Sequence, residues 1–236
     1  MSYSFDGAGD IMTGSFTSAY NVPFALVTWI KIANHLVVVD RFISVGNTNN
    51  AEASSVNIRT ENVDNQFNAE AKDASAVASS AQIVLTIDGV WTCFLAQYRA
   101  DDLITLYVGE RANSASSGVT RAFSDVQHIR LGENFTGGAD FAGLQAESAF
   151  ITGTLSDTEI DDIMSGVRVS GVVSGAALKG YWPLDTDNTT QANEGSDTAG
   201  DLSVTGAVFD ADHPTITEPT GTAPTLYVSR SAIRLV

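Results

Sequence analysis

Residues 24–32 read Phe-Ala-Leu-Val-Thr-Trp-Ile-Lys-Ile, and this stretch decides the fold class. Successive side chains of a β-strand point to opposite sides, so one side of this segment carries Phe, Leu, Thr and Ile and the other carries Ala, Val, Trp and Lys. Both sides are largely apolar. The pattern therefore predicts a strand at the centre of a sheet that is covered on both faces.

The same kind of signal recurs along the chain in short runs rich in β-branched and aromatic residues, separated by Gly, Asn, Asp and Ser clusters. This spacing is typical of an antiparallel sandwich. Further strands are expected at residues 3–5, 41–45, 55–59, 81–85, 92–98, 104–108, 128–131, 144–150 and 178–182.

One segment predicts a helix. Ser156 and Glu159 have the spacing of a capping box, the apolar residues that follow share one face, and Gly166 supplies a natural stop. A single short helix near residues 156–165 excludes a doubly wound α/β fold and a TIM barrel, in which helices alternate with strands. The sequence therefore predicts an all-β fold, a two-sheet antiparallel jelly-roll sandwich with one short helix.

Composition and charge narrow the class of partner. The chain has 236 residues, of which 44% are hydrophobic, and 12 Lys+Arg against 28 Asp+Glu give a net charge of −16. Phosphate backbones are bound through positive surface, so nucleic acid is excluded as a partner. No apolar stretch approaches the ~18 residues that a membrane-spanning helix needs, and the start lacks the pattern of a signal peptide. We expect no membrane insertion and synthesis in the cytoplasm.

The end of the chain differs from the rest. Residues 1–210 are expected to form the jelly-roll domain, and residues 211–236 an extended arm whose prolines, Pro214, Pro219 and Pro224, limit ladder hydrogen bonds. An apolar, locally basic and strand-like segment closes this arm and contains Leu226, Val228, Arg230, Ile233, Arg234 and Leu235. Such a segment suits docking against a neighbouring subunit by strand addition. A frayed terminus, or one folded back on its own domain, is the alternative.

Catalytic patterns are missing from the sequence. Glycan hydrolysis needs two carboxylates facing each other across the sugar, and no Glu-x-Asp-x-Glu pattern occurs; the acidic cluster at residues 157–162 is interpreted as a solvated helix face. No Gly-x-Ser-x-Gly elbow is present, and His35, His128 and His213 have no catalytic partner at a useful spacing. Cys93 lies in an apolar strand and is interpreted as inert core. No enzyme activity is predicted.

Calcium is the one candidate cofactor. Oxygen ligands occur at Asp185, Asp187 and Asn188, and again in the Glu-Gly-Ser-Asp loop at residues 194–197. No complete EF-hand loop is present, and such groups arise easily by chance in an acidic chain. The sequence assigns no cofactor and leaves Asp185, Asp187 and Asn188 as weak calcium candidates.

Large aromatic residues and one buried acid complete the expected core. The aromatic residues expected in the core rather than as sugar platforms are Trp29, Trp91, Tyr98, Tyr107 and Trp182. Glu147 stands in an apolar strand, so it is expected to be a paired structural acid rather than a catalytic one.

Several short motifs occur in a fixed order along residues 1–210. They are residues 3–7 (YSFDG), 42–46 (FISVG), 88–91 (DGVW), 104–109 (ITLYVG), 129–132 (IRLG), 141–147 (FAGLQAE), 155–160 (LSDTEI) and 181–184 (YWPL). This order resembles that of laminin-G-like jelly-roll domains of the concanavalin A-like lectin/glucanase superfamily. The resemblance implies the same fold. The catalytic carboxylates of the glucanase branch have no counterpart, which argues against hydrolysis.

Residues 211–214 (ADHP) resemble the ending of short laminin-G-like proteins found in bacteriophage and prophage genomes. This resemblance implies a non-enzymatic virion structural protein, a capsid or tail decoration or adhesion module that assembles with other virion proteins or with itself. The alternative is a carbohydrate-binding, lectin-like module for host cell-surface glycans, with calcium as a candidate aid.

Overall fold

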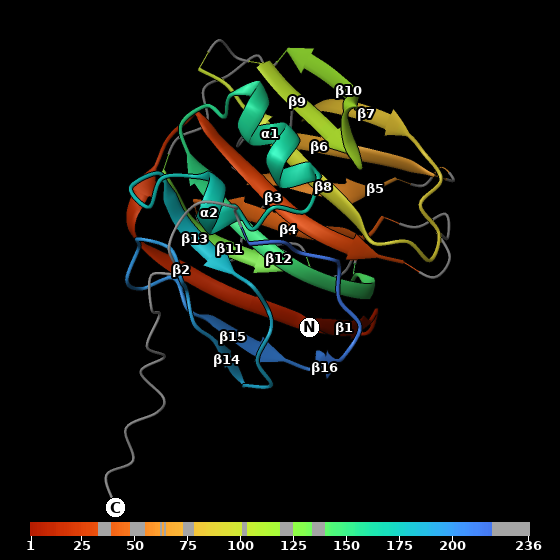
Figure 1. Ribbon diagram of the computed structural model, residues 1–236, viewed down its shortest axis with the longest axis vertical. Coiled ribbons are helices and arrows are strands. Elements are labelled where there is room, and N and C mark those ends of the chain that lie inside the picture. The colour runs from red at the N-terminus through yellow and green to blue at the C-terminus, as the bar shows by residue number, and fades with distance from the viewer. Residues whose placement is uncertain are drawn as a thin grey trace, which may run out of the picture.

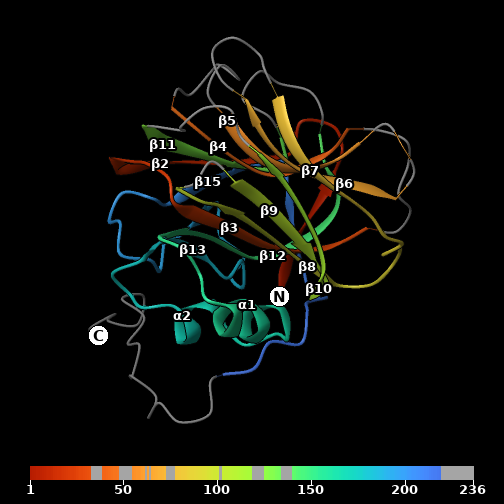
Figure 2. The same cartoon turned by 90° about the horizontal axis from the view of Figure 1, so that it is seen from above.

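The computed structural model describes residues 1–32, 39–47, 55–61, 63, 65–72, 78–100, 103–118, 125–133 and 140–218. Two antiparallel sheets pack face to face, and two short helices, α1 (Asp157–Met164) and α2 (Val169–Val172), cover the outer side of one of them. Figure 1 shows the sandwich, and Figure 2 shows helices, first sheet and second sheet as three successive layers. The predicted all-β, two-sheet jelly roll is confirmed.

The helix-covered sheet is called sheet A. It runs in the order β10 (Glu110–Gly118), β9 (Leu103–Val108), β8 (Thr92–Tyr98), β3 (Phe24–Lys31), β12 (Ala142–Thr152), β1 (Ser2–Asp6) and β16 (Val208–Asp210), with β13 (Leu178–Trp182) also paired to β12. The central strand is β3, as its two apolar sides predict. Its neighbours on either side are β8 and β12.

The second sheet is called sheet B. It runs in the order β14 (Thr190–Gln191), β15 (Leu202–Thr205), β2 (Ile11–Tyr20), β11 (Val126–Leu131), β4 (Arg41–Gly46), β5 (Ser55–Thr60), β6 (Gln66–Lys72) and β7 (Ala78–Val84). All ten strands expected from the sequence occur. The sequence did not predict β2, β6, β10, β14, β15 and β16, which are short or rich in Gly, Ala, Ser, Thr and Asn and so lack the apolar alternation of the others.

The two sides of β3 belong to two separate cores. Phe24, Leu26 and Ile30 pack between the sheets, whereas Ala25 and Val27 pack under the helices. Sheet A is therefore buried on both faces, and α1 and α2 form part of a hydrophobic core with it.

Local chemistry explains where α1 begins and ends. The Ser156 hydroxyl accepts a hydrogen bond from the Glu159 N–H, and the Glu159 carboxylate accepts one from the Ser156 N–H, which is the predicted capping box. After Ser165, Gly166 adopts φ +93°, a backbone conformation that favours glycine and stops the helix. The four residues of α2 are too few to show a helical period, so the sequence did not predict it.

The chain beyond β16 lies along the domain as far as the structure describes it, to Glu218. The Asp212 carboxylate pairs with Lys31 Nζ at 2.5 Å and accepts a hydrogen bond from Trp91 Nε1 at 3.0 Å. Thr217 forms two backbone hydrogen bonds, one donated to the Gly166 carbonyl and one accepted from the Arg168 N–H.

Most of the predicted arm falls beyond this point. Pro214 lies in the described part, and the residues outside the described ranges are Pro219, Pro224, Leu226, Val228, Arg230, Ile233, Arg234 and Leu235. The division into a domain of residues 1–210 and an arm of residues 211–236 stays a prediction. Within the described ranges, no helix has the length and apolar character needed to cross a membrane.

The helix layer can be tested on α1. Ile163 is fully buried under the helix, whereas Asp162, next to it, is exposed. We expect Ile163→Ala to lower the free energy of unfolding by about 2–4 kcal/mol because it leaves a cavity between α1 and sheet A. The matched control Asp162→Ala should change it by less than about 0.5 kcal/mol. Urea unfolding measures both values, and equal losses in the two variants would show that α1 does not contribute to the core.

Candidate functional site

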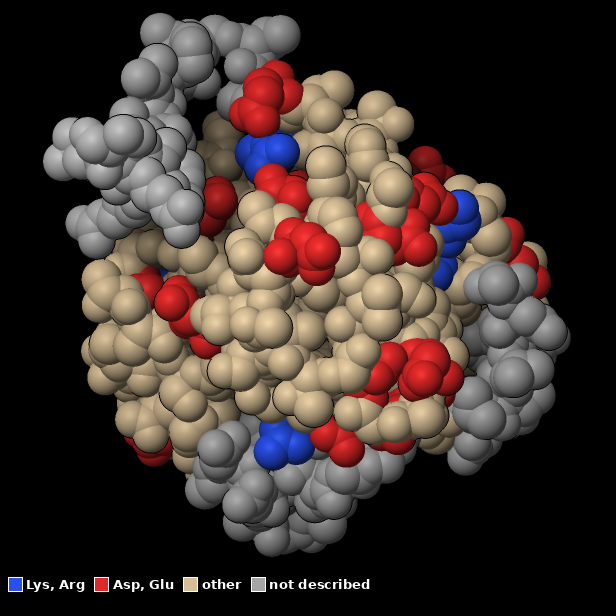
Figure 3. Space-filling view, turned by 90° about the horizontal axis from the view of Figure 1, so that it is seen from below, with Lys and Arg blue, Asp and Glu red and all other residues tan. Residues whose placement is uncertain are grey.

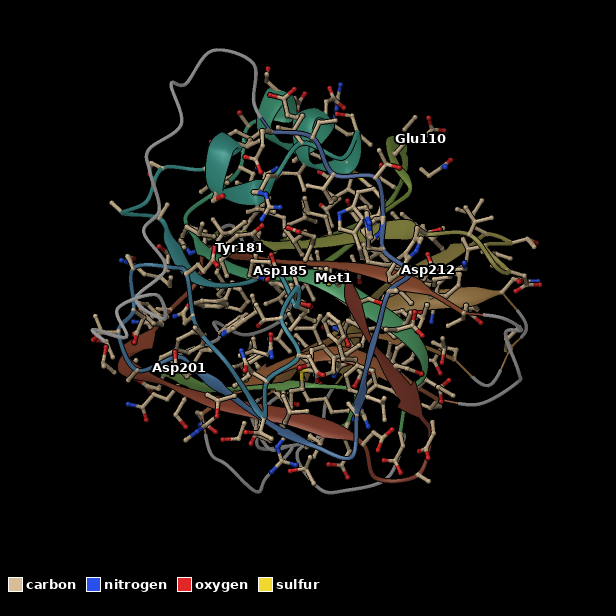
Figure 4. All side chains as sticks on the ribbon, turned by 60° about the horizontal axis from the view of Figure 1, so that its bottom comes forward. Met1, Glu110, Tyr181, Asp185, Asp201 and Asp212 are labelled. Carbon is tan, nitrogen blue, oxygen red and sulfur yellow. The ribbon has the colours of Figure 1, made fainter. Side chains whose placement is uncertain are left out.

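A cavity of about 290 Å³ opens on the outer side of sheet A, beside α2. The residues that line it are Met1, Glu147, Arg168, Asp185, His213, Pro214 and Ile216. Five separate parts of the chain contribute: the start, β12, the residue before α2, the segment after β13, and residues 211–218 after β16, which we call the strap. Figure 4 shows Met1 and Asp185 close together with Tyr181 nearby, and Glu110 well away from them at the edge of the sheet.

The cavity arises where β12 changes its partner. The first half of β12 pairs with β1, ending at the pair Tyr3 and Gln145, and the second half pairs with β13, beginning at the pair Ser148 and Trp182. Residues 146 and 147 lie between the two ladders. Glu147, Met1 at the start of the chain and Asp185 after β13 all line the cavity.

Glu147 stands at this change of partner. A β-bulge interrupts the ladder between β12 and β3 here, and Glu147 adopts φ +47°. On the inner side the Gln145 amide nitrogen donates to Thr28 Oγ1 at 2.9 Å and lies 3.0 Å from the Phe42 carbonyl, which fixes the strand just before the bulge. A bulge of this kind redirects one side chain, and the redirected side chain is that of Glu147.

A second residue with left-handed backbone directly precedes a residue of the cavity lining. Leu184, directly before Asp185, adopts φ +58°. Left-handed backbone in a residue other than glycine costs about 1–3 kcal/mol and tends to cluster at functional sites. Two such residues, Glu147 and Leu184, adjoin this cavity.

Glu147 is 5% exposed and is held from two sides. The Tyr181 hydroxyl donates a short hydrogen bond to Oε2, and Arg168 Nη1 lies 3.9 Å from Oε1. Burial raises the pKa of Glu147, the Tyr181 and Arg168 contacts oppose that rise without cancelling it, and the charge of Asp185 adds to it. Glu147 is thus the paired acid that the sequence predicts, and it also lines a cavity.

Arg168, which caps α2, makes three contacts around the cavity. Its Nε lies 2.7 Å from Glu218 Oε1, and its Nη1 donates to the Tyr181 hydroxyl at 3.3 Å. Asp185 adds a second carboxylate to the lining. Burial is the largest cause of the raised pKa of Glu194, and the negative charge of Asp185 is the second largest.

The calcium candidates Asp185, Asp187 and Asn188 lie in different surroundings, and their role as calcium ligands stays a prediction. Asp185 lines the cavity, whereas the Asn188 carbonyl accepts hydrogen bonds from the Tyr3 hydroxyl at 2.8 Å and from Gln191 at 3.0 Å. Asp187 is exposed and is not among the cavity residues. In the described ranges, no three His, Cys, Asp or Glu side chains form a group that could hold a metal ion.

The histidines and the cysteine fall in different settings. His213 lines the cavity, His128 Nδ1 lies 2.8 Å from the Ser15 hydroxyl, and His35 lies outside the described residues. Cys93 is fully buried, and burial raises the pKa of its thiol, which fits the inert role expected of it.

The large aromatic residues lie away from the cavity lining. Trp182 and Tyr98 are buried, and Trp29, Trp91 and Tyr107 are half-buried. None of the described lining residues is Phe, Tyr or Trp, so a ligand here would meet polar groups, the imidazole of His213 and the aliphatic carbons of the strap.

Sequence reasoning missed Glu147 and Arg168 as a pair. They lie far apart in the sequence and meet only because of the bulge and the position of α2. The available signal is an acid inside an apolar strand, which predicts a structural role for Glu147.

The fold occurs in other proteins, although no protein-family model and no curated protein matches the sequence. A putative carbohydrate binding protein from Bacteroides ovatus has a TM-score of 0.59 at 12% identity, over 89% of this chain and 60% of that one. A heptameric SAP-like pentraxin from Limulus polyphemus gives 0.54 at 14% identity, over 87% of this chain and 95% of that one. The binding domain of botulinum neurotoxin serotype D gives 0.54 at 13% identity, over 69% of this chain and 41% of that one.

At such low identity these likenesses show the fold alone. The chain has the two-sheet jelly-roll fold that these proteins share, which confirms the predicted fold. The bacteriophage subgroup stays a prediction.

Asp197, in the second candidate calcium loop at residues 194–197, has a structural role that can be tested. Asp197 is 4% exposed and accepts hydrogen bonds from the Thr17 N–H at 3.0 Å, the Tyr20 hydroxyl at 2.7 Å and the Ala199 N–H at 3.1 Å. Burial alone would raise the pKa of Asp197, but these hydrogen bonds outweigh it and hold the pKa below its usual range.

We expect Asp197→Asn to lower the free energy of unfolding at neutral pH by about 1.5–3 kcal/mol, since hydrogen bonds to a charged acceptor are lost. Because the pKa is lower in the folded state, this contribution is complete well above the unfolded value of about 3.9 and is lost as pH falls through the folded value. Urea unfolding of both proteins at neutral and acidic pH measures it. A difference between them that stays constant down to the acid limit would contradict the assignment.

Proposed function

We propose that the protein is a non-enzymatic, lectin-like module that binds a sugar unit in the cavity beside α2. The observation that carries the proposal is the cavity itself, about 290 Å³, into which ionisable side chains converge from different elements. Ligand pockets span roughly 300–1,000 Å³, so this one lies just below the lower end of that range. That size suits one monosaccharide unit, such as the end of a glycan.

The lining has the chemistry that sugar hydroxyls need. A hydroxyl both donates and accepts, and here the carboxylates of Glu147 and Asp185 accept while Arg168 donates. Pro214 and Ile216 supply an aliphatic wall for the carbon–hydrogen face of a ring. The fold shared with a putative carbohydrate binding protein supports the same proposal.

Binding without turnover is the form of the proposal that the contacts favour. A glycoside hydrolase needs two carboxyl groups free to act on either side of the scissile bond. Here one oxygen of Glu147 is already bound by the Tyr181 hydroxyl, and the backbone of Glu147 is held by a hydrogen bond to the Pro183 carbonyl.

Glycan-array screening followed by titration calorimetry tests the proposal. We expect a bound glycan to lose about tenfold or more in affinity with Asp185→Ala or Arg168→Ala, because each removes a charged hydrogen-bonding group, worth about 1.5–3 kcal/mol. Glu110→Gln, exposed and distant from the cavity, should bind as the parent does. Melting curves establish that the variants fold.

Two further arms sharpen this test. Parallel arrays with calcium and with chelator show whether Asp185, Asp187 and Asn188 act through a cation. Prolonged incubation with the bound glycan should release no new reducing ends. Absence of binding to every glycan in both conditions would contradict the proposal, and turnover that Glu147→Gln abolishes would replace it with a catalytic one.

A second function is proposed for the end of the chain: attachment of the domain to a bacteriophage particle or to further copies of itself. The ADHP sequence at residues 211–214 supports it, together with the contacts of Asp212 and Thr217 that anchor the strap to the domain. The chain then continues into residues 219–236, an apolar and locally basic stretch on an otherwise acidic protein. Such a stretch suits strand addition to a neighbouring subunit.

Truncation after Glu218 tests this second function, because it keeps the contacts of the strap. We expect an unchanged melting temperature, a loss of oligomer mass in light scattering, and a loss of co-sedimentation with the particles of the source culture. The full chain should travel with the major capsid protein at a fixed ratio. Full-length protein that stays in the soluble fractions would refute attachment to a particle.

A further inference from the structure

We propose that β10, the edge strand of sheet A, is the surface that receives residues 225–236 of a second copy of this chain. This inference rests on the second function proposed above, strand addition by the end of the chain, and adds the surface on which that strand docks. It depends on the open edge of β10, on the state of the other three sheet edges, and on the charges around β10.

β10 is an edge strand that buries none of its nine residues, each of which is exposed or half-buried. Its sheet partner is β9, and within the described part of the chain no hydrogen bond joins its backbone to any other segment. After a bulge between Glu110 and Ser114, the ladder with β9 is regular from Ser114 to Gly118. An edge of this kind presents a row of unpaired N–H and C=O groups, which is a template for a strand of another chain.

The other three sheet edges are less suitable. β16 and β14, at the far ends of sheets A and B, have three and two residues, and short edge strands resist pairing with other chains. Figure 1 shows both at the opposite end of the molecule from β10. β7 is long enough, but the charges on the two strands next to it are balanced, because Arg59 and Lys72 pair with Glu61 and Glu70.

Acidic side chains outnumber basic ones around β10. Glu110 begins the strand and is exposed, and α1, which packs beside β10, exposes Asp157, Asp161 and Asp162. Arg111 Nη1 lies 3.1 Å from Asp157 Oδ2, and its Nε lies 2.8 Å from Asp161 Oδ1. One guanidinium thus faces several carboxylates, so the open edge favours a basic partner strand.

The end of the chain has the complementary composition. Residues 225–236 read Thr-Leu-Tyr-Val-Ser-Arg-Ser-Ala-Ile-Arg-Leu-Val, with two arginines and no acid. In a strand Arg230 and Arg234 would share one side, because side chains alternate. At about 3.3 Å per residue this segment is long enough to cover the whole of β10. Figure 3 shows acidic groups widely spread over one face of the molecule, in keeping with the net charge of −16, so a basic strand suits this protein as a partner.

The position of α1 favours a second copy as the source of this strand. The strap is fastened beside α2, through the contacts of Thr217 and Glu218 with Arg168. α1 contacts both α2 and β10, and it lies between them in Figures 1 and 2. The arm of the same copy would have to pass over α1 to reach β10, whereas the arm of a second copy approaches the open edge from outside.

Sedimentation velocity of the full chain at low salt, over a range of concentrations, tests the proposal. We expect Ser114→Lys to raise the dissociation constant of the oligomer at least about tenfold, because a lysine on an edge strand blocks strand addition and repels the arginines of the arm. The matched control is Gln82→Lys, which places the same charge at an exposed position of β7 and should change the constant by less than about twofold. Melting curves establish that both variants fold.

A charge swap and hydrogen exchange locate the contact. Arg230→Glu with Arg234→Glu should weaken association at least about tenfold, and so should Glu110→Lys with Asp162→Lys. The four changes together should restore it to within about threefold of the parent, since opposite charges again face each other. In the parent oligomer, amides in residues 114–118 should exchange at least about tenfold more slowly than in the Arg230→Glu, Arg234→Glu variant, while those of β7 should not differ.

Each failure has its own reading. Equal effects of Ser114→Lys and Gln82→Lys, or unslowed exchange at residues 114–118, would overturn β10 as the acceptor; strand addition would still stand if truncation after Glu218 abolished association. Slowed exchange at residues 114–118 in a protein that sediments as a monomer would place the arm on its own domain and overturn the role of a second copy. A full chain that stays monomeric with freely exchanging β10 amides would overturn self-association and the inference together.

Discussion

The candidate site depends on one constraint: β12 must serve two partners along a single edge. Its eleven residues pair first with β1 and then with β13, and the backbone has to bridge the gap between the two ladders. The bulge at Glu147 does so, and the N–H of that residue still finds the Pro183 carbonyl at 3.3 Å. A buried backbone group is thus satisfied while an acid is turned outward. Because Glu147 stands on a strand, its position is set by the sheet rather than by a loop, which favours a preorganised site.

The two faces of sheet A are covered by different parts of the chain. The inner face packs against sheet B, and the outer face is covered by α1 and α2 over β3, β8, β12 and β13 and by the strap near the cavity. Basic side chains form ion pairs that hold the strap and the helices in place. Lys31 holds Asp212, Arg111 holds Asp157 and Asp161 of α1, and Arg168 holds Glu218. Each of these cations is thus engaged by a carboxylate within the described part of the chain.

The sequence predicted those elements whose signal is local. The two apolar sides of residues 24–32 predicted the central strand, and the spacing of Ser156 and Glu159 predicted the start of α1. The edge strand β10 was missed because its Ala, Ser and Asn residues give no apolar alternation. The site could be predicted only in fragments. Asp185 stood out as a loop carboxylate, but its meeting with Glu147 and Arg168 depends on strand register and on left-handed backbone at residues that are neither Gly nor Asn.

The anchoring of the strap has a mechanical consequence. Tension applied to the chain beyond Glu218 would first load the ion pair of Glu218 with Arg168 and the backbone bonds of Thr217 to Gly166 and Arg168, which form an isolated bridge. The next contacts to resist the tension are the ion pair of Asp212 with Lys31 and its hydrogen bond with Trp91, followed by the pairing of β16 with β1. His213, Pro214 and Ile216 lie between the first two of these points, so one wall of the cavity would be pulled away while both sheets were still intact. Force on the tail would thus open the proposed binding cavity before it disrupted either sheet.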